Sequence, residues 1–255
     1  MAVVPLGSET SVAYTWSTPY GRRTMRLPRP EAEVLPGVAW GAPYEAPSPA
    51  YWAMEAALAV ERHDAEPVAV GASLLEQYVY CLLCGYGTPS EFGVAIFHRL
   101  RERGVLEYRG DVEALTLALE EPIPIRNGRV GRYRFARQRA RYLAAGLANF
   151  PATLSHALPM RAALLALPGV GLKTASWIVR DWYGSDDVAV LDVHIIGTCR
   201  LMDVFPCEWE PSRNYPEMEQ QFLRFARAIG VRPSVLDNVM WREVRAAGKA
   251  LKATA

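Results

Sequence analysis

One stretch, residues 167–175 with the sequence LPGVGLKTA, constrains the fold more than any other part of the chain. An apolar helical segment runs into Pro168, which cannot continue a helix, and two glycines then bracket Val170 before a second helix opens. Gly169 and Gly171 permit a positive φ and a close approach of the backbone to a neighbour. The N–H groups of this turn and of the next helix's first turn lack partners within the helix and form a nest that suits a phosphate. The stretch therefore predicts a helix-hairpin-helix, whose usual partner is the nucleic-acid backbone, with Gly169, Val170 and Gly171 as DNA contacts.

Length, composition and charge bound the class of protein. A chain of 255 residues is long enough for a sizeable core in one large domain or two intimate lobes. Its 51% apolar and 22% charged residues are typical of a globular protein. The net charge of +1 gives no sign of a nucleic-acid partner, so any DNA-binding arginines must be concentrated locally. The sequence has no apolar run of about eighteen residues and no basic leader, so we expect no membrane contact and a cytoplasmic location.

The four cysteines are Cys81, Cys84, Cys199 and Cys207, and for the first two we favour core packing over a metal or redox site. Cys81 and Cys84 have the C-x-x-C spacing of metal and redox sites, but they lie in an apolar helical run without a second cysteine pair nearby. Cys199 and Cys207 are too few for a four-cysteine iron–sulfur cluster. We therefore expect no metal and no cofactor.

The first part of the chain differs in composition from the rest. Residues 1–48 are rich in proline, glycine and aromatic residues and show no sustained period, although the alternation over residues 10–16 allows a short hairpin. The segment is either an arm that contacts DNA or bridges two lobes, or an irregular wrap whose aromatics dock on the body, which we favour. We expect residues 1–70 to form this irregular arm and a first helix, and residues 71–255 to form the core.

From residue 49 onward, apolar periodicity and capping residues predict an almost wholly helical protein. The predicted helices cover residues 49–63, 71–84, 90–104, 111–121, 130–149, 151–158, 160–167, 172–183, 192–202, 217–229 and 233–252. Residues 206–215 are predicted to be a loop. A concentrated basic segment contains Arg126, Arg129, Arg132, Arg134, Arg137, Arg139 and Arg141. A solvated arginine face is the simplest interpretation of this segment, with DNA contacts for a minority of its members.

Asp192 follows Lys173 by nineteen positions, in the run VAVLDVH. The combination of LPGVGLKTA with LDVHI resembles the helix-hairpin-helix/Gly-Pro-Asp (HhH-GPD) superfamily of base-excision DNA glycosylases, in its lysine-containing, bifunctional branch. The DVH after the hairpin is most similar to the 8-oxoguanine DNA glycosylases. The resemblance covers about residues 72–248. It implies an all-α, two-lobed helical HhH-GPD glycosylase fold with an irregular N-terminal segment.

The resemblance assigns the chemistry to Lys173 and Asp192. Lys173 would attack C1′ of the damaged nucleoside, expel the base and form a Schiff base, after which β-elimination nicks the strand; taken alone, it is an ordinary surface lysine. Asp192 would stay ionised and stabilise oxocarbenium character at the sugar, and it is also a favoured N-cap residue, so both roles can hold. His194 resembles a family histidine close to DNA and is expected to contact a phosphate, with a capping or core-edge histidine as the alternative.

Three further residues are assigned by resemblance to the handling of the extruded base. Tyr86 occupies the place of the residue that wedges into the duplex; alternatively, it covers the core beneath a turn. The motif LDNVMW resembles a late-helix L-D-x-x-x-W pattern of archaeal 8-oxoguanine glycosylases, in which the aspartate and the tryptophan line the base pocket. Asp237 would accept a hydrogen bond from a purine N–H and Trp241 would stack on the ring, and their spacing places both on one helical face. The alternative is a helix cap and a core residue.

Together these features predict a bifunctional DNA glycosylase/AP lyase that removes 8-oxoguanine in base-excision repair. The expected partner is double-stranded DNA that contains a damaged base, bound by a monomer without a cofactor. Two alternatives remain open. One is a lysine glycosylase for another damaged or modified base, and the other is a non-catalytic helix-hairpin-helix DNA-binding protein in which Lys173 contacts a phosphate.

Overall fold

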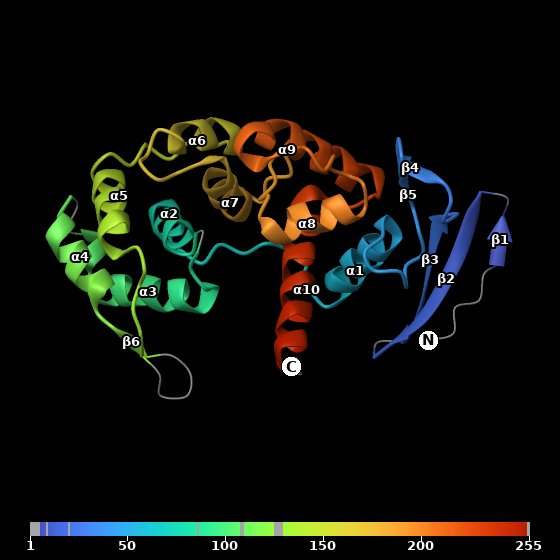
Figure 1. The fold of residues 1–255 in the computed structure, drawn as a ribbon, viewed down its shortest axis with the longest axis horizontal. Helices are drawn as coiled ribbons and strands as arrows, with labels where there is room; N and C mark the ends of the chain where they lie inside the picture. The colour runs from blue at the N-terminus through green and yellow to red at the C-terminus, as the bar shows by residue number, and fades with distance from the viewer. Residues whose placement is uncertain are drawn as a thin grey trace. The chain divides into compact units, whose positions relative to one another are not determined.

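The structure is a computed structural model of the chain, and it describes residues 6–8, 10–19, 21–85, 87–107, 110–124 and 130–253. Helices dominate the fold, as predicted, and the strands form small antiparallel sheets (Figure 1). The chain forms two compact units: the first combines Met1–Pro67 with Asp186–Ala255, and the second is Val68–Ser185. The chain therefore passes between the units twice, while the division expected at residue 70 stays a prediction.

An antiparallel sheet opens the first unit. Its strands are β1 (Leu6–Ser8), β2 (Ser11–Thr18) and β3 (Gly21–Pro28), in the order β1-β2-β3. One face carries Tyr14, Trp16 and Leu27, all buried, because alternate residues of a strand point to the same side. A small hairpin follows, of β4 (Glu33–Leu35) and β5 (Val38–Ala39). The hairpin allowed by the alternation at residues 10–16 is thus confirmed, and the segment expected to be irregular contains regular structure.

The helices of the first unit are α1 (Pro49–Glu61), α8 (Val193–Leu201), α9 (Pro211–Ala228) and α10 (Pro233–Ala253). Small apolar residues pack α1 against α10, among them Ala56, Ala59 and Val239. The loop predicted over residues 206–215 is too long: α9 begins at Pro211, because a proline is tolerated in the first turn of a helix. The helix then kinks at Asn214.

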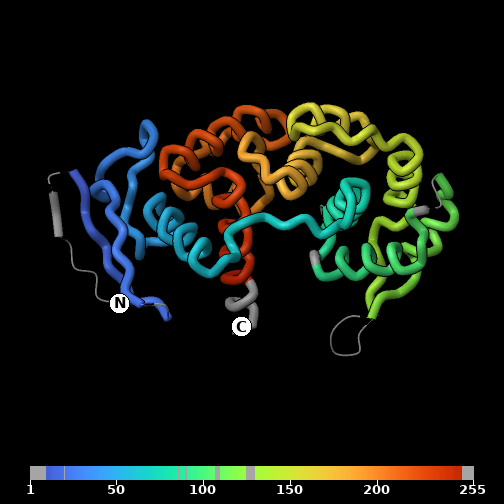
Figure 2. Tube along the Cα trace, turned by 180° about the vertical axis from the view of Figure 1, so that it is seen from behind, coloured from blue at the N-terminus to red at the C-terminus, as the bar shows by residue number. Residues whose placement is uncertain are grey.

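The second unit is a helical body with one small ribbon, of β6 (Ile123–Pro124) and β7 (Val130–Gly131). Its helices are α2 (Leu74–Leu83), α3 (Ser90–Glu102), α4 (Val112–Glu120), α5 (Ala136–Ala148), α6 (Ala157–Leu164) and α7 (Leu172–Tyr183), with the 3-10 helix η1 (Val105–Glu107). Residues 64–70, on the path from α1 to α2, form no helix or strand and can be followed in Figure 2. Helix α2 packs against α3, α5 and α7, and its Tyr78, Leu82 and Leu83 are buried, so it forms the centre of this unit.

Two predicted helices of the second unit are corrected by the structure. The helix predicted over residues 130–149 begins only at Ala136, because Val130 and Gly131 pair with β6. The helix predicted over residues 151–158 is wrong: residues 151–156 are non-helical, and α6 begins at Ala157. Over a segment this short, apolar spacing does not distinguish a helix from a loop.

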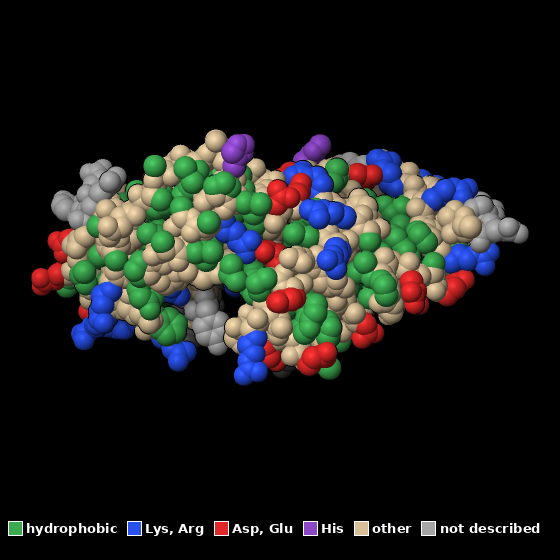
Figure 3. All heavy atoms as spheres, turned by 90° about the horizontal axis from the view of Figure 1, so that it is seen from above, with side chains coloured by type: hydrophobic (Ala, Val, Ile, Leu, Met, Phe, Trp, Pro, Cys, Tyr) green, Lys and Arg blue, Asp and Glu red, His purple; other side chains and the backbone are tan. Residues whose placement is uncertain are grey.

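The buried cysteines and the mixed charges on the surface fit a globular protein with a net charge of +1. Cys81 and Cys84 are buried, which confirms core packing for this pair; Cys199 is buried as well, and Cys207 is exposed. In the described part of the chain, no three His, Cys, Asp or Glu side chains gather in a way that could hold a metal ion. On the face drawn in Figure 3, basic and acidic side chains are interspersed. Among the described helices, none is both long enough and apolar enough to cross a membrane.

Candidate nucleic-acid interface and active site

The predicted hairpin lies between α6 and α7, which pack side by side (Figure 1 and Figure 2). Gly169 has a φ of +78°, in the left-handed region that favours glycine. Gly171 is extended, with φ −100° and ψ 178°, and is the N-cap of α7. Leu167 and Val170 are buried, and Val170 N donates to Leu167 O at 3.2 Å. Of the two glycines, therefore, only Gly169 needs to be glycine for its backbone conformation.

The start of α7 offers backbone N–H groups to a ligand. The first N–H groups of a helix have no acceptor within it, and the N-cap Gly171 has no side chain to supply one. A Cβ at Gly171 would meet no atom within 4 Å, so the turn is open at this position. Because the N–H of Val170 is used inside the turn, the groups best placed for a phosphate are those at the start of α7. DNA contact by Gly169, Val170 and Gly171 stays a prediction.

Lys173 is the second residue of α7 and is partly buried. Ala175 and Ser176, which follow it, are fully buried and fix this part of the helix on the body of the unit. No carboxylate in the described part of the chain forms an ion pair with Lys173. Within the described part of the chain, therefore, no ion pair holds the amine of Lys173 away from a substrate that it could attack as a nucleophile.

A buried polar cluster, which the sequence did not predict, holds the far end of α7. Arg180 and Asp181 form an ion pair at 2.7 Å, with 8% and 5% of their side chains exposed. Gln77 of α2 donates from Nε2 to Asp181 at 3.3 Å, and its Oε1 accepts from the N–H groups of Val70 and Gly71. Burial raises the pKa of Asp181, and the adjacent Arg180 opposes this shift. A glutamine directly before the apolar run at residues 78–83 of α2 is the signal that could have indicated this cluster.

Asp192 is the N-cap of α8, as its residue type predicts. Its Oδ1 accepts from His194 N at 2.8 Å and from Ile195 N at 3.0 Å. Its Oδ2 has no hydrogen-bond partner among the described residues, and both Asp192 and His194 are partly exposed. The cap therefore fixes the direction of the carboxylate and leaves one oxygen for a ligand. The phosphate contact of His194 stays a prediction.

Asp237 and Trp241 both belong to α10. Asp237 is 1% exposed, and its Oδ2 accepts from Val190 N at 2.6 Å. It thus supports the segment that leads to Asp192, a contact that its motif did not indicate. Trp241 is partly exposed, and the guanidinium of Arg245 lies 4.9 Å from a ring centroid of its indole. These contacts do not test base binding by either residue, which stays a prediction.

The remaining predicted residue, Tyr86, lies outside the described residues. Helix α2 ends before it at Leu83, and Gly87 after it has a φ of +79°.

Lys173 belongs to the second unit and Asp192 to the first, so the two predicted catalytic residues come from different units of the chain.

Comparison with known proteins adds two findings. A sequence model of the family described as 8-oxoguanine DNA glycosylase matches residues 69–231, more than half of the chain. Among solved structures, the chain is similar to a Methanocaldococcus jannaschii 8-oxoguanine glycosylase/lyase in complex with a 15mer DNA containing 8-oxoguanine. The two share 24% sequence identity and a TM-score of 0.50, over 66% of this chain and 78% of that one, a likeness of fold. No curated protein matches the chain.

Proposed function

Because the chain belongs to the 8-oxoguanine DNA glycosylase family, we propose that it excises 8-oxoguanine from duplex DNA by means of Lys173 and Asp192. Membership makes it a base-excision repair DNA glycosylase, of the bifunctional type that also acts as a lyase at the abasic site. One observation carries the assignment of the nucleophile. The hairpin opens α7, and Lys173 stands in the first turn of that helix without a carboxylate partner in the described part of the chain.

In the proposed reaction, the ε-amine of Lys173 attacks C1′ of the damaged nucleoside as the glycosidic C1′–N9 bond breaks. The electron pair of that bond leaves with the base, which takes up a proton. The sugar ring then opens at O4′, and a Schiff base forms between C1′ and Nζ. Removal of a proton from C2′ expels the 3′ phosphate by β-elimination, which nicks the strand. The attack requires the uncharged form of the amine.

Asp192 is proposed to stabilise the positive charge that develops on the sugar as the base leaves. The hydrogen bonds from His194 N and Ile195 N hold Oδ1, so Oδ2 meets the sugar without further ordering of the side chain. A charge that is oriented before the reaction stabilises the transition state more than one that must reorganise during it. The cap of α8 is therefore part of the proposed catalytic arrangement.

The DNA is proposed to bind through its phosphate backbone and its extruded base. The N–H groups of the hairpin and of the first turn of α7 take up a phosphate, helped by the helix dipole, and His194 contacts another phosphate. The lesion leaves the base stack before it reacts, as in other enzymes that act on bases within a duplex. Asp237 then accepts a hydrogen bond from the purine and Trp241 stacks on it, while Tyr86 fills the gap in the duplex.

The lesion and the compartment are the finer parts of the proposal. The solved structure of similar fold contains DNA with 8-oxoguanine, which supports this lesion as the substrate. The cytoplasmic location stays a prediction, because DNA in a nucleus or a nucleoid would serve as substrate equally well.

A panel of duplexes, each with a single lesion, tests the proposed function. The protein is incubated with duplexes that carry 8-oxoguanine, an oxidised pyrimidine or no lesion, with and without borohydride. We expect strand cleavage and a covalent adduct with the 8-oxoguanine duplex, because borohydride reduces an imine between lysine and sugar to a stable bond. Adducts that form only with another lesion would identify that lesion, and not 8-oxoguanine, as the substrate. Binding without an adduct on any lesion would overturn the catalytic assignment.

A further inference from the structure

A buried segment that is neither helix nor strand, residues 188–191, leads directly to Asp192 and pairs with no strand among the described residues. Val188 and Ala189 are fully buried, and Leu191 is 2% exposed. Buried backbone N–H and C=O groups need hydrogen-bond partners, which a neighbouring strand would normally supply. In this protein, side chains from α9 and α10 supply them.

Tyr215 of α9 provides two of these partners with one hydroxyl group. Its Oη accepts from Leu191 N at 3.3 Å and donates to Ala189 O at 2.8 Å. Tyr215 is only 5% exposed, so the contact is shielded from solvent. The hydroxyl thus ties together the two residues on either side of Val190, immediately before Asp192.

Two buried carboxylates accept hydrogen bonds from the N–H groups of Ala189 and Val190. Glu219 of α9, 7% exposed, accepts from Ala189 N at 3.0 Å. Asp237 of α10 accepts from Val190 N at 2.6 Å, and Val190 O in turn accepts from Asp192 N at 2.9 Å. Every backbone N–H from Ala189 to Asp192 is therefore hydrogen-bonded, three of them to side chains of α9 and α10.

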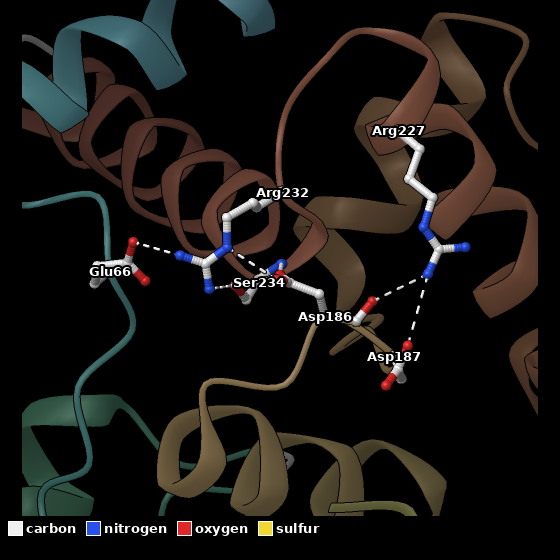
Figure 4. A network of polar contacts seen from close by, with 6 residues as sticks. All are labelled: Glu66, Asp186, Asp187, Arg227, Arg232 and Ser234. Atoms are coloured by element: carbon white, nitrogen blue, oxygen red, sulfur yellow. Dashed lines mark hydrogen bonds and ion pairs between the residues drawn. The ribbon is translucent and has the colours of Figure 1, made fainter.

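The chain just before this segment is held by a separate set of contacts (Figure 4). Asp186 Oδ1 accepts from Ser234 N at 3.0 Å and from Ser234 Oγ at 2.6 Å, and its Oδ2 accepts from Arg232 Nε at 2.8 Å. Arg232 also forms an ion pair with Glu66 at 2.7 Å. The path to Asp192 is thus anchored at Asp186 and again at residues 189–191.

We propose that Tyr215 is a positioning residue that sets the direction of the Asp192 carboxylate, an inference that rests on the proposed function of Asp192. Without the hydroxyl, the N–H of Leu191 and the C=O of Ala189 would be buried without this partner, and the segment would shift to pair them. Because the cap of α8 is local, Asp192 would keep its cap while Oδ2 moved relative to the sugar. A displacement of about 1 Å is enough to slow an enzyme roughly a hundredfold.

Tyr215→Phe tests the inference, because it keeps the buried ring and removes only the hydroxyl. Two single-turnover assays are compared: excision of 8-oxoguanine from a duplex, and borohydride trapping on a duplex with a preformed abasic site. An abasic sugar has no glycosidic bond left to break, so trapping on it needs Lys173 but no stabilised sugar cation. We expect excision to fall at least about tenfold, while trapping on the abasic duplex stays within about threefold of the parent.

Tyr133→Phe is the matched control, since Tyr133 is 4% exposed and its hydroxyl donates to Leu83 O at 2.9 Å in the second unit. It should lose a similar amount of stability and excise at the parental rate. If Tyr215→Phe does not fold, Glu219→Gln and Glu219→Leu take its place. The glutamine keeps an acceptor for Ala189 N and should excise like the parent, whereas the leucine lacks one and should lose excision but keep abasic trapping.

Parental excision by Tyr215→Phe, or an equal loss of excision and abasic trapping, would overturn the positioning role. If Glu219→Leu is used in place of Tyr215→Phe, the same outcomes for that variant would overturn the positioning role. A parent protein that neither excises 8-oxoguanine nor traps abasic DNA would instead overturn the proposed function, and the positioning role with it. The activity of the parent protein therefore distinguishes a failure of the positioning role from a failure of the proposed function.

Discussion

The Cδ2 atom of Tyr142 lies 2.3 Å from the point at which a Cβ on Gly169 would stand. Tyr142 belongs to α5, and Gln138 of the same helix donates from Nε2 to its hydroxyl at 3.1 Å. The turn of the hairpin therefore rests directly on an aromatic ring. Glycine is needed at position 169 for two reasons: its φ is positive, and no side chain fits between the turn and this ring.

Gly169→Ala should destabilise the protein by at least about 2 kcal/mol, because alanine is strained in the left-handed region and its Cβ displaces the ring. Affinity for duplex DNA should fall as well, since the hairpin moves. Gly171→Ala is the control: the residue is extended and its Cβ meets nothing within 4 Å, so the cost should stay below about 1 kcal/mol. Urea unfolding of both variants measures the difference, and equal costs would contradict the assignment.

Lys173→Gln should bind lesion-containing DNA and give no borohydride adduct, because the amine is the group that forms the imine. Lys173→Arg is the companion variant, since it keeps a positive charge for any phosphate contact but lacks the amine nucleophile. Both should be inactive, and arginine should bind DNA at least as well as glutamine. An undiminished adduct in either variant would show that another residue is the nucleophile.

Asp192→Asn should retain the fold and the affinity for DNA while losing most base excision. The amide oxygen still caps α8 but carries no charge to stabilise a sugar cation. Asp192→Ala loses both functions and should also be less stable than the asparagine variant by about 0.5–2 kcal/mol. Single-turnover excision and thermal unfolding separate the two effects; excision within a few-fold of the parent in Asp192→Asn would reduce this residue to a cap.

Asp237→Asn should weaken the excision of 8-oxoguanine by roughly 1–3 kcal/mol of transition-state stabilisation, the cost of one lost buried hydrogen bond. 8-Oxoguanine has an N7–H donor that guanine lacks, and a carboxylate accepts from it better than an amide. The oxygen of asparagine still accepts from Val190 N, so the melting temperature should stay close to that of the parent. Excision at the parental rate would contradict base binding by Asp237.

The stability of the first unit should depend on pH through Asp186. Burial alone would raise the pKa of Asp186, but hydrogen bonds from Ser234 and Arg232 lower it below its ordinary value. A lowered pKa in the folded state means that the stabilisation is complete above the unfolded value of about 4 and is lost as the pH falls through the folded value. Arg232→Met should therefore be less stable than the parent at neutral pH, and the difference should narrow in acid.

Melting temperatures between about pH 7 and pH 2 measure this dependence. The control is Arg227→Met, because Arg227 pairs with Asp187 at 3.7 Å with 57% and 65% of the side chains exposed, a pair that contributes little. A difference between Arg232→Met and the parent that stays constant with pH would exclude the ion pair as its cause.

Local signals in the sequence determined where the helices and the proposed reactive residues lie. Helix α7 has its predicted bounds, Leu172–Tyr183, because the glycines before it and Gly184 after it act within a few residues of the helix ends. Asp192 caps α8 for a similar reason, since the bonds of a cap join a side chain to N–H groups two and three residues ahead. The hairpin likewise follows from adjacent residues, and only the ring of Tyr142 beneath it comes from elsewhere.

The contacts that hold the segment before Asp192 were decided by the tertiary structure alone. Tyr215 and Glu219 lie 24 and 30 residues from the backbone groups Leu191 N and Ala189 N that they pair, and Asp237 lies 47 residues from Val190. A helix satisfies the hydrogen bonds of its own backbone, so its own residues are enough to predict it. A buried segment outside a helix takes its partners from whichever side chains the packing of other helices brings to it. No periodicity within residues 188–192 specifies those partners, and only the packing of α9 and α10 does.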